Sequence, residues 1–146
     1  MEPKQGTPIN IQSFLPHREP MLMADYILEL TPEQVTTSFE IKPDNVFLHN
    51  GVFTEVGLIE HSAQTCSSIL GQSFYKGPHE ETKLIGFITN IKKIEVFKLP
   101  TAGKTIISKA SLLSKYDKIC NIFCETFCDD ELLIRTEISL FIQEIE

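Results

Sequence analysis

The sequence contains no apolar run long enough to cross a membrane, since no stretch of about 18 uncharged apolar residues occurs in it. Its beginning, MEPKQGTPIN, lacks the apolar core of a secretory signal. Internal repeats and low-complexity tracts are also absent, and the proportions of apolar (42%) and charged (23%) residues are those of an ordinary globular protein. For 146 residues we therefore expect one soluble, cytoplasmic domain over residues 1–146, and neither a disordered nor a fibrous chain.

The sequence also lacks a glycine-rich phosphate-binding loop and a cluster of metal ligands at suitable spacing. Cys120, Cys124 and Cys128 recur at every fourth position, but the segment around them alternates like a β-strand. Residues four apart on a strand are separated by about 13 Å, which is too far for a shared metal ion. We expect these thiols and Cys66 to be buried as small apolar groups in a reducing compartment. No metal, nucleotide or flavin cofactor is expected.

Positive charge is scarce overall and concentrated in one segment. The chain has 13 basic and 20 acidic residues, and its net charge of −7 argues against nonspecific nucleic-acid binding. Residues 83–118 contain eight lysines and two acidic residues, a local charge of +6, whereas the other residues together carry −13. Such a segment can attract an acidic partner protein. Alternatively, the lysines only protect strand edges from aggregation.

Hydrophobic periodicity predicts one long helix among several strands. Apolar residues recur at helical spacing between Glu55 and Tyr75, and Gly77-Pro78 ends this helix. The residues expected to form its apolar stripe are Val56, Ile59, Ala63, Cys66, Leu70 and Phe74. Alternating patterns predict strands over residues 21–30, 35–41, 83–97, 105–116, 119–128 and 131–143. A short helical turn is expected between Asn10 and Pro16.

The order of these elements predicts an α+β domain. Late strands with no helix between them must pair in antiparallel fashion. The sheet has one apolar face, and the single long helix is also apolar. Both surfaces are buried if the sheet curls around the helix. We therefore expect an antiparallel sheet wrapped around one long central helix.

Three segments resemble one enzyme family. Residues 15–25 (LPHREPMLMAD) are similar to the opening signature of the 3-hydroxyacyl-[acyl carrier protein] dehydratases, which have the hot-dog fold. Residues 45–65 resemble their active-site loop and central helix, with a glutamate-x-x-alanine-glutamine pattern at Glu60, Ala63 and Gln64. Residues 85–106 resemble their third-strand region, with its basic stretch and Pro–Gly turn. The form of the loop is more similar to relatives in aryl polyene or flexirubin-type pigment synthesis than to those of housekeeping fatty-acid synthesis.

The resemblance implies elimination of water from a (3R)-hydroxyacyl thioester on acyl carrier protein, which gives the trans-2-enoyl thioester in fatty-acid or polyene biosynthesis. In this family a histidine removes the C2 proton, and a helix carboxylate helps the 3-hydroxyl leave as water. Backbone N–H groups polarise the thioester carbonyl. These groups suit the reaction. Histidine can act as the base because its pKa is near the working pH, and preorganised N–H donors stabilise the developing enolate.

The family pattern assigns the carboxylate to Glu60, at the edge of the expected apolar stripe. The family's histidine precedes its carboxylate by fourteen residues, a position that Val46 occupies here. His49 lies eleven residues before Glu60 and is the candidate base, unless it is a loop residue with no role. The N–H groups of Gly57 and Leu58 are the candidate donors to the thioester carbonyl. Gly57 could also be only a tolerated residue in the first helical turn.

The other three histidines are expected to have structural roles. His61 lies about 180° from the apolar stripe, so it should face a partner subunit or solvent. His17 should organise the entry of the chain through hydrogen bonds. His79, beside Gly77-Pro78, should be a loop residue.

The family also implies a homodimer or higher homo-oligomer, with an acyl tunnel between subunits. Leu58 and Ile69 are apolar residues outside the main helical stripe and would need a second cover. We expect Lys92, Lys93 and Lys98 to contact acyl carrier protein, and we expect neither nucleic acid nor a membrane as a partner.

Two other functions remain open from the sequence. A hot-dog acyl-thioester hydrolase would use the helix carboxylate to activate water. A non-catalytic subunit would only bind an acyl group or a carrier protein.

Overall fold

One helix and two groups of β-strands make up the computed structural model, which describes residues 8–71 and 83–145. The first part contains β1 (Ile9–Asn10), the 3-10 turn η1 (Ile11–Ser13), β2 (Tyr26–Leu30) and β3 (Gln34–Glu40). The short strands β4 (Leu48–His49) and β5 (Val52–Phe53) precede the helix α1 (Glu55–Gly71). The remaining strands are β6 (Lys83–Val96), β7 (Thr105–Tyr116), β8 (Ile119–Cys128) and β9 (Glu131–Ile145).

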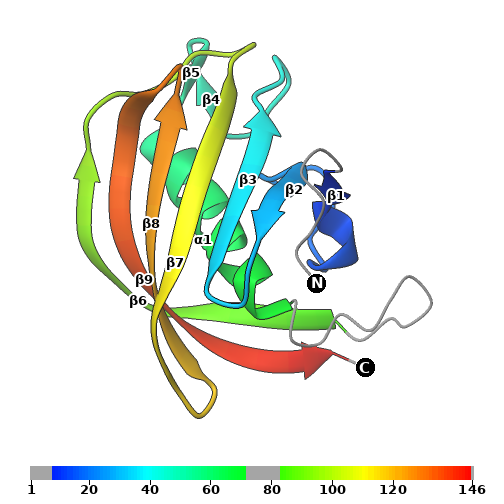
Figure 1. The fold of residues 1–146 in the computed structure, drawn as a ribbon. Helices are drawn as coiled ribbons and strands as arrows, with labels where there is room; N and C mark the ends of the chain where they lie inside the picture. The colour runs from blue at the N-terminus through cyan, green and yellow to red at the C-terminus, as the bar shows by residue number, and fades with distance from the viewer. Residues whose placement is uncertain (1–7, 72–82, 146) are drawn as a thin grey trace.

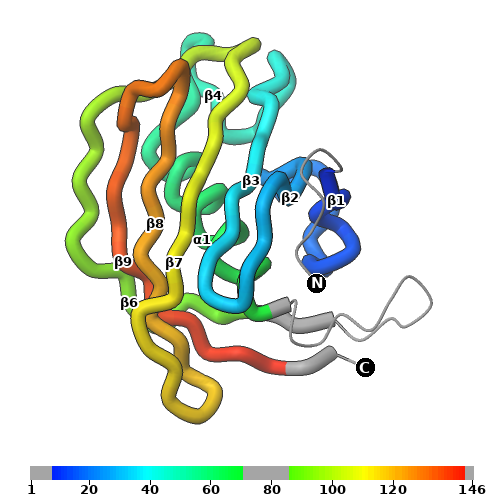
Figure 2. Tube along the Cα trace, viewed as in Figure 1, coloured from blue at the N-terminus to red at the C-terminus, as the bar shows by residue number. Residues whose placement is uncertain are grey.

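The long strands form one antiparallel sheet that curves around α1 (Figure 1). Its seven strands have the order β1-β2-β3-β7-β8-β9-β6, so β1 and β6 lie at the two ends. The hairpin of β7 and β8 extends beyond the rest of the sheet (Figure 2). The predicted α+β architecture, a sheet wrapped around one helix, is confirmed. No helix among the described residues is long and apolar enough to cross a bilayer.

Alternating side chains explain why the late strands form where the sequence predicts them. Along β8, every second residue is buried against the helix side, and the expected ranges 105–116 and 119–128 are those of β7 and β8. The expected strand over residues 21–30 is wrong in its first half, because β2 begins only at Tyr26. Before it, the N–H groups of Met21 and Leu22 both donate to the Arg18 carbonyl, which makes a turn.

The helix is buried on more sides than its sequence indicates. All residues from 61 to 70 are buried, because α1 packs against β3, β6, β7, β8 and β9. Leu58 and Ile69, which were expected to need a second cover, are buried within this chain. Val56 was expected in the apolar stripe but is 60% exposed. The expected end of the helix, residues 72–75, lies outside the described residues, as does His79.

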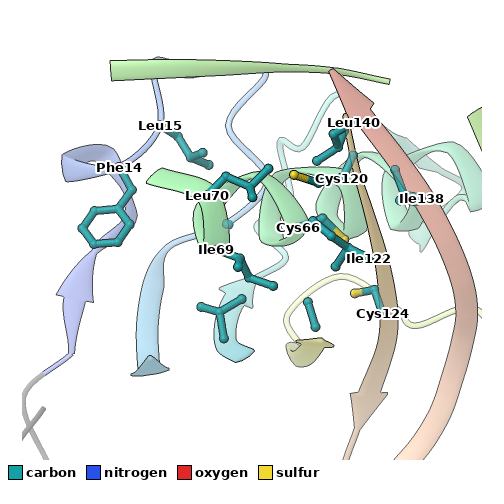
Figure 3. Close-up of a cluster of buried hydrophobic side chains, with 14 of the residues drawn as sticks. Phe14, Leu15, Cys66, Ile69, Leu70, Cys120, Ile122, Cys124, Ile138 and Leu140 are labelled. Atoms are coloured by element: carbon teal, nitrogen blue, oxygen red, sulfur yellow. The ribbon is translucent and has the colours of Figure 1, made fainter. Parts of the chain in front are cut away.

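The four cysteines are free and buried, as expected for small apolar side chains. Cys66 on α1 and the β8 residues Cys120 and Cys124 belong to one hydrophobic cluster, and Figure 3 shows Cys66 directed towards β8. Cys128 belongs to a second cluster nearer the start of the helix. Burial raises the pKa of the Cys66 thiol well above its usual range, which keeps this thiol protonated.

The β4–β5 hairpin is an element that the strand prediction missed. Its two turn residues, Asn50 and Gly51, have φ angles of 51° and 76°, the left-handed conformation that type I′ hairpins require. The N–H of Phe53 donates to the Pro100 carbonyl at 2.8 Å, so the hairpin is attached to the turn before β7. The Asn-Gly pair was the available signal for this hairpin.

Candidate active site

A cavity of about 200 Å³ lies between α1, the edge strand β6 and the segment before β2, and Glu60 borders it. The helix contributes Glu60 and Gln64, and β6 contributes apolar surface. His17 comes from residues 15–25 before β2, which we call the opening segment. The residues that line the cavity are His17, Glu60, Ala63, Gln64, Ser67, Gly86, Phe87 and Ile88. A carboxylate, an imidazole and an amide therefore share one partly apolar space.

Gln64 holds Glu60 in place through a hydrogen-bond chain. Its Nε2 donates to Glu60 Oε1 at 2.9 Å and to the Met21 carbonyl at 2.8 Å. Its Oε1 accepts the N–H of Met23 at 2.7 Å. Because the amide is fixed at both ends by the backbone of the opening segment, it fixes the carboxylate as well. The spacing of four helical residues between Glu60 and Gln64 was the signal for this contact.

His17 lies in the same cavity with a ring nitrogen that has no partner. Its Nδ1 is buried and makes no hydrogen bond within the part of the chain that the structure describes. Burial lowers the pKa of His17, with Arg18 acting in the same direction and Glu60 opposing them. The expectation that His17 organises the chain entry through hydrogen bonds gains no support among the described residues, where Arg18 Nη1 bonds this turn by donating to the carbonyls of Leu15 and His17.

His61 is fully buried, so the expectation that it faces solvent or a partner is wrong. Its Nδ1–H donates to the Met23 carbonyl, and its Nε2 accepts the hydroxyl of Ser108 at 2.7 Å. Ser108 in turn lies 2.6 Å from the hydroxyl of Thr126. Burial lowers the pKa of His61 to about 4, so it is neutral at pH 7. The curved sheet covers this face of α1, which a helical count does not reveal.

His49, the sequence's candidate base, lies outside the Glu60 cavity. It ends β4 on the exposed side of the hairpin, and its Nε2 is 3.3 Å from Asn50 Nδ2. It is not one of the residues that line the cavity. Within one chain, the fold therefore does not bring His49 and Glu60 into the same space.

The start of the helix places the two candidate N–H donors differently. The N–H of Leu58 donates to the Thr54 carbonyl at 3.0 Å, as in any helical turn. The N–H of Gly57 makes a long contact of 3.5 Å with Thr54 Oγ1, so it is the freer of the two, but neither Gly57 nor Leu58 lines the Glu60 cavity. A Cβ at Gly57 would lie 2.6 Å from the Phe53 ring, which gives this glycine a packing role.

The three lysines expected to contact a carrier protein are all exposed. Lys92 and Lys93 lie where β6 bulges away from β9, and Lys93 has a φ of 53°. Neither takes part in an ion pair between described residues. Lys98 pairs with Glu131 at 3.1 Å. The charges of Lys92 and Lys93 are therefore the more available ones.

Two other cavities have a different chemistry. One of about 190 Å³ is lined by acidic residues of the opening segment and of the β3 end, with Lys42 among them. Another of about 240 Å³ lies beside Cys128 and the ion pairs of Lys98 and Lys104. Neither is lined by a histidine, so the Glu60 cavity is the candidate site for acid–base chemistry.

Comparisons with known proteins identify the family of the chain. A sequence model of the ApeP-like family, described as ApeP dehydratase, matches residues 9–145. The 3-hydroxyacyl-[acyl-carrier-protein] dehydratase FabZ of Psychrobacter arcticus is 25% identical over 140 residues, which cover 92% of this chain and 94% of that protein. The FabZ of Helicobacter pylori is 28% identical over 146 residues, which cover 94% of this chain and 91% of that protein.

Solved structures share the architecture. The dehydratase heterocomplex ApeI:P from Xenorhabdus doucetiae superposes with a TM-score of 0.81 at 17% identity, over 91% of this chain and 90% of that one. A hypothetical thioesterase from Streptococcus pneumoniae TIGR4, solved with coenzyme A, has a TM-score of 0.62 at 10% identity, over 80% and 84% of the two chains. These similarities establish the hot-dog fold that the sequence predicts.

Proposed function

Because the chain belongs to the ApeP-like family of dehydratases, we propose that Glu60 donates the proton with which the 3-hydroxyl of a (3R)-hydroxyacyl thioester leaves as water. The observation that carries this proposal is the position of Glu60, fixed by Gln64 at the wall of a cavity. The FabZ relatives are named as 3-hydroxyacyl-[acyl-carrier-protein] dehydratases, which supports an acyl carrier protein as the bearer of the substrate. The product is the trans-2-enoyl thioester.

The cavity suits such a substrate in two ways. Phe87 and Ile88 of β6 offer apolar surface for an acyl chain, and Glu60 with Gln64 offers polar groups for the hydroxyl. A carboxyl group held by an amide needs no reorientation when the C3–O bond breaks, which favours proton transfer. The N–H of Gly57 is the proposed donor to the thioester carbonyl.

The match to the ApeP-like family supports the aryl polyene branch over housekeeping fatty-acid synthesis. The four free cysteines favour a cytoplasmic setting.

We further propose a homodimer formed along β6. This strand pairs with β9 on one side and ends the sheet on the other. It carries exposed apolar side chains, of which Phe87 and Ile88 line the Glu60 cavity, and a second copy would cover them. They are Phe87, Ile88, Ile94 and Val96, followed directly by Phe97. If His49 is the base, only a second copy can bring it to the Glu60 cavity.

The role of Glu60 is tested with a 3-hydroxyacyl thioester on acyl carrier protein and mass-spectrometric detection of water loss. Glu60→Gln should lower kcat about 10²–10⁴-fold, because the amide cannot donate a proton to the leaving hydroxyl. Glu55→Gln removes the same charge from the exposed first turn of α1 and should leave the rate near wild type. Equal rates for the two variants would remove Glu60 from the site.

The same assay separates the other functions. Release of free acid by the wild-type protein would indicate the hydrolase. Binding of the loaded carrier protein with neither product would indicate a non-catalytic subunit.

Lys92, Lys93 and Lys98 are the proposed contacts for the acidic carrier protein. The double variant Lys92→Gln/Lys93→Gln should weaken carrier-protein binding about two- to tenfold at low salt, with a smaller difference at physiological salt. Lys98→Gln should have less effect, because Glu131 already neutralises this lysine. The control is Lys115→Gln/Lys118→Gln at the β7–β8 turn, measured by titration calorimetry. If both double variants weaken carrier-protein binding equally, the loss comes from net charge alone and Lys92 and Lys93 are not specific contacts.

A further inference from the structure

Glu60 shares its cavity with an imidazole of the same chain. Among the buried side-chain nitrogen and oxygen atoms of residues 8–70 and 86–143, His17 Nδ1 is the one without a hydrogen-bond partner. Buried polar atoms are nearly always paired, so an exception beside a carboxylate requires an explanation. His17 also lines the cavity with Glu60, so a substrate bound there would lie against the imidazole as well as the carboxyl group.

A purely structural role does not account for His17. The turn around it is held by Arg18, whose Nη1 donates to the carbonyls of Leu15 and His17 at 2.9 and 2.7 Å. The Arg18 carbonyl accepts the next two bonds of the turn, from Met21 and Leu22. Between the residues that the structure describes, the imidazole shows no hydrogen bond to this segment, and its unpaired buried nitrogen costs stability.

We propose that His17 is the base of the Glu60 cavity and takes the C2 proton of the substrate, within the same chain that supplies the acid. This inference rests on the proposed dehydratase function. The C2–H bond breaks with its proton moving to His17, and its electrons form the C2=C3 double bond. The C3–O bond breaks, and the hydroxyl leaves as water with the proton from Glu60. Proton return from His17 to Glu60 through solvent restores both groups.

The electrostatics of the cavity fit this assignment. Burial lowers the pKa of His17, which favours the neutral ring that can accept a proton. A neutral imidazole carries its hydrogen on one nitrogen and leaves a lone pair on the other, which can accept the proton. Glu60 raises the pKa of His17 when it is ionised, so the two groups share a proton, and the form with neutral His17 and protonated Glu60 is the reactive one. Each chain then carries a complete acid–base pair, and His49 need not enter the cavity.

The kinetic test compares kcat and KM across pH for the wild type, His17→Gln, His17→Phe and His49→Gln, with 3-hydroxybutyryl-acyl carrier protein as the probe. His17→Gln should lower kcat about 10²–10⁴-fold with little change in KM, and the acid limb of kcat/KM should disappear. His17→Phe keeps the ring volume and should show the same loss. An acid limb that persists in both His17 variants and disappears in His49→Gln would overturn the proposal and leave the dehydratase function intact. A wild-type protein that removes no water would overturn that function itself.

A second measurement does not depend on an active variant. Titration of the His17 ring protons by NMR should give a pKa below 6.5 in the wild type, equal to the pKa of the kinetic acid limb. Glu60→Gln should lower the pKa of His17 further, because the carboxylate that raises it is gone. Glu55→Gln should leave it unchanged. A pKa of His17 that does not respond to Glu60→Gln would disprove the pairing.

Discussion

Glu60 and His61 are neighbours on α1, but their side chains lie in opposite kinds of environment. His61 is buried under the sheet, with Met23 and Ser108 bonded to its two ring nitrogens. Glu60 borders a cavity at the edge of the sheet and is bonded to Gln64. Successive helical residues differ in direction by about 100°, which is enough to place one beneath β7 and the other beside β6. One turn of the helix thus contributes His61 to the buried hydrogen-bonded cluster under the sheet and Glu60 to the candidate site.

The imidazoles of His61, which is buried, and of His17, which is half-buried, show what separates these environments. Burial lowers the pKa of both His61 and His17. His61 has a partner at each nitrogen, as a structural polar group requires. His17 has an unpaired nitrogen next to a carboxylate. Hydrogen-bond satisfaction, and not the pKa shift, therefore distinguishes the structural histidine from the candidate functional one.

The largest expected effect comes from a substitution in the buried polar cluster of His61, Ser108 and Thr126. His61→Ala should lower the free energy of unfolding by about 3–5 kcal/mol, because it leaves a cavity and removes the partners of the Met23 carbonyl and Ser108. Glu60→Gln, at the cavity, should change it by less than about 1 kcal/mol. Urea denaturation measures both. If His61→Ala costs no more than Glu60→Gln, the two sides of the helix do not differ as the structure indicates.

A smaller effect follows from the pKa of His61, about 4 in the folded protein against 6.5 as its ordinary value. Between these two pH values the unfolded chain binds a proton that the folded protein does not. Stability is therefore complete above pH 6.5 and falls by about 3 kcal/mol as the pH drops to 4. His17 acts in the same direction, and Asp25, whose pKa is raised by burial, acts in the opposite one.

The variant His61→Gln isolates the contribution of His61. Its amide keeps a donor and an acceptor but does not titrate. Urea denaturation at several pH values should show the difference between wild type and variant shrinking as the pH falls. A difference that stays constant from pH 7 to 4 would contradict the assignment of a neutral, buried His61.

The sequence predicts most of the fold because strand and helix periodicities are local properties. The ranges of β7 and β8 follow from alternation alone. The environment of His61 was predicted wrongly for a physical reason: a helical count assumes one buried and one outer face. Here the sheet surrounds so much of α1 that residues 61–70 have no outer face, while Val56, counted in the apolar stripe, is exposed.

The candidate site was predictable only in part. The motif identified Glu60, and helical spacing connects it to Gln64. The position of His17 depends on the path of the chain from η1 to β2, where hydrogen bonds far apart in sequence bring residue 17 beside residue 60. No local pattern specifies such a contact. His49, chosen by its distance along the chain, lies instead on a hairpin that was not foreseen.

The smallest expected effect concerns the close approach of β6 to α1 at the cavity. A Cβ on Gly86 would lie 2.7 Å from Ser67 Oγ, but 3.5 Å from Ser67 Cβ. Gly86→Ala should therefore lower the free energy of unfolding by about 1 kcal/mol through overpacking. Ser67→Ala removes the clashing oxygen, so the double variant should recover most of this loss. The coupling energy, measured as a double-mutant cycle by urea denaturation, should be about 1 kcal/mol and favourable. If the two effects are strictly additive, Gly86 and Ser67 are not in close contact. In that case β6 lies further from α1 at the wall of the Glu60 cavity than the structure indicates.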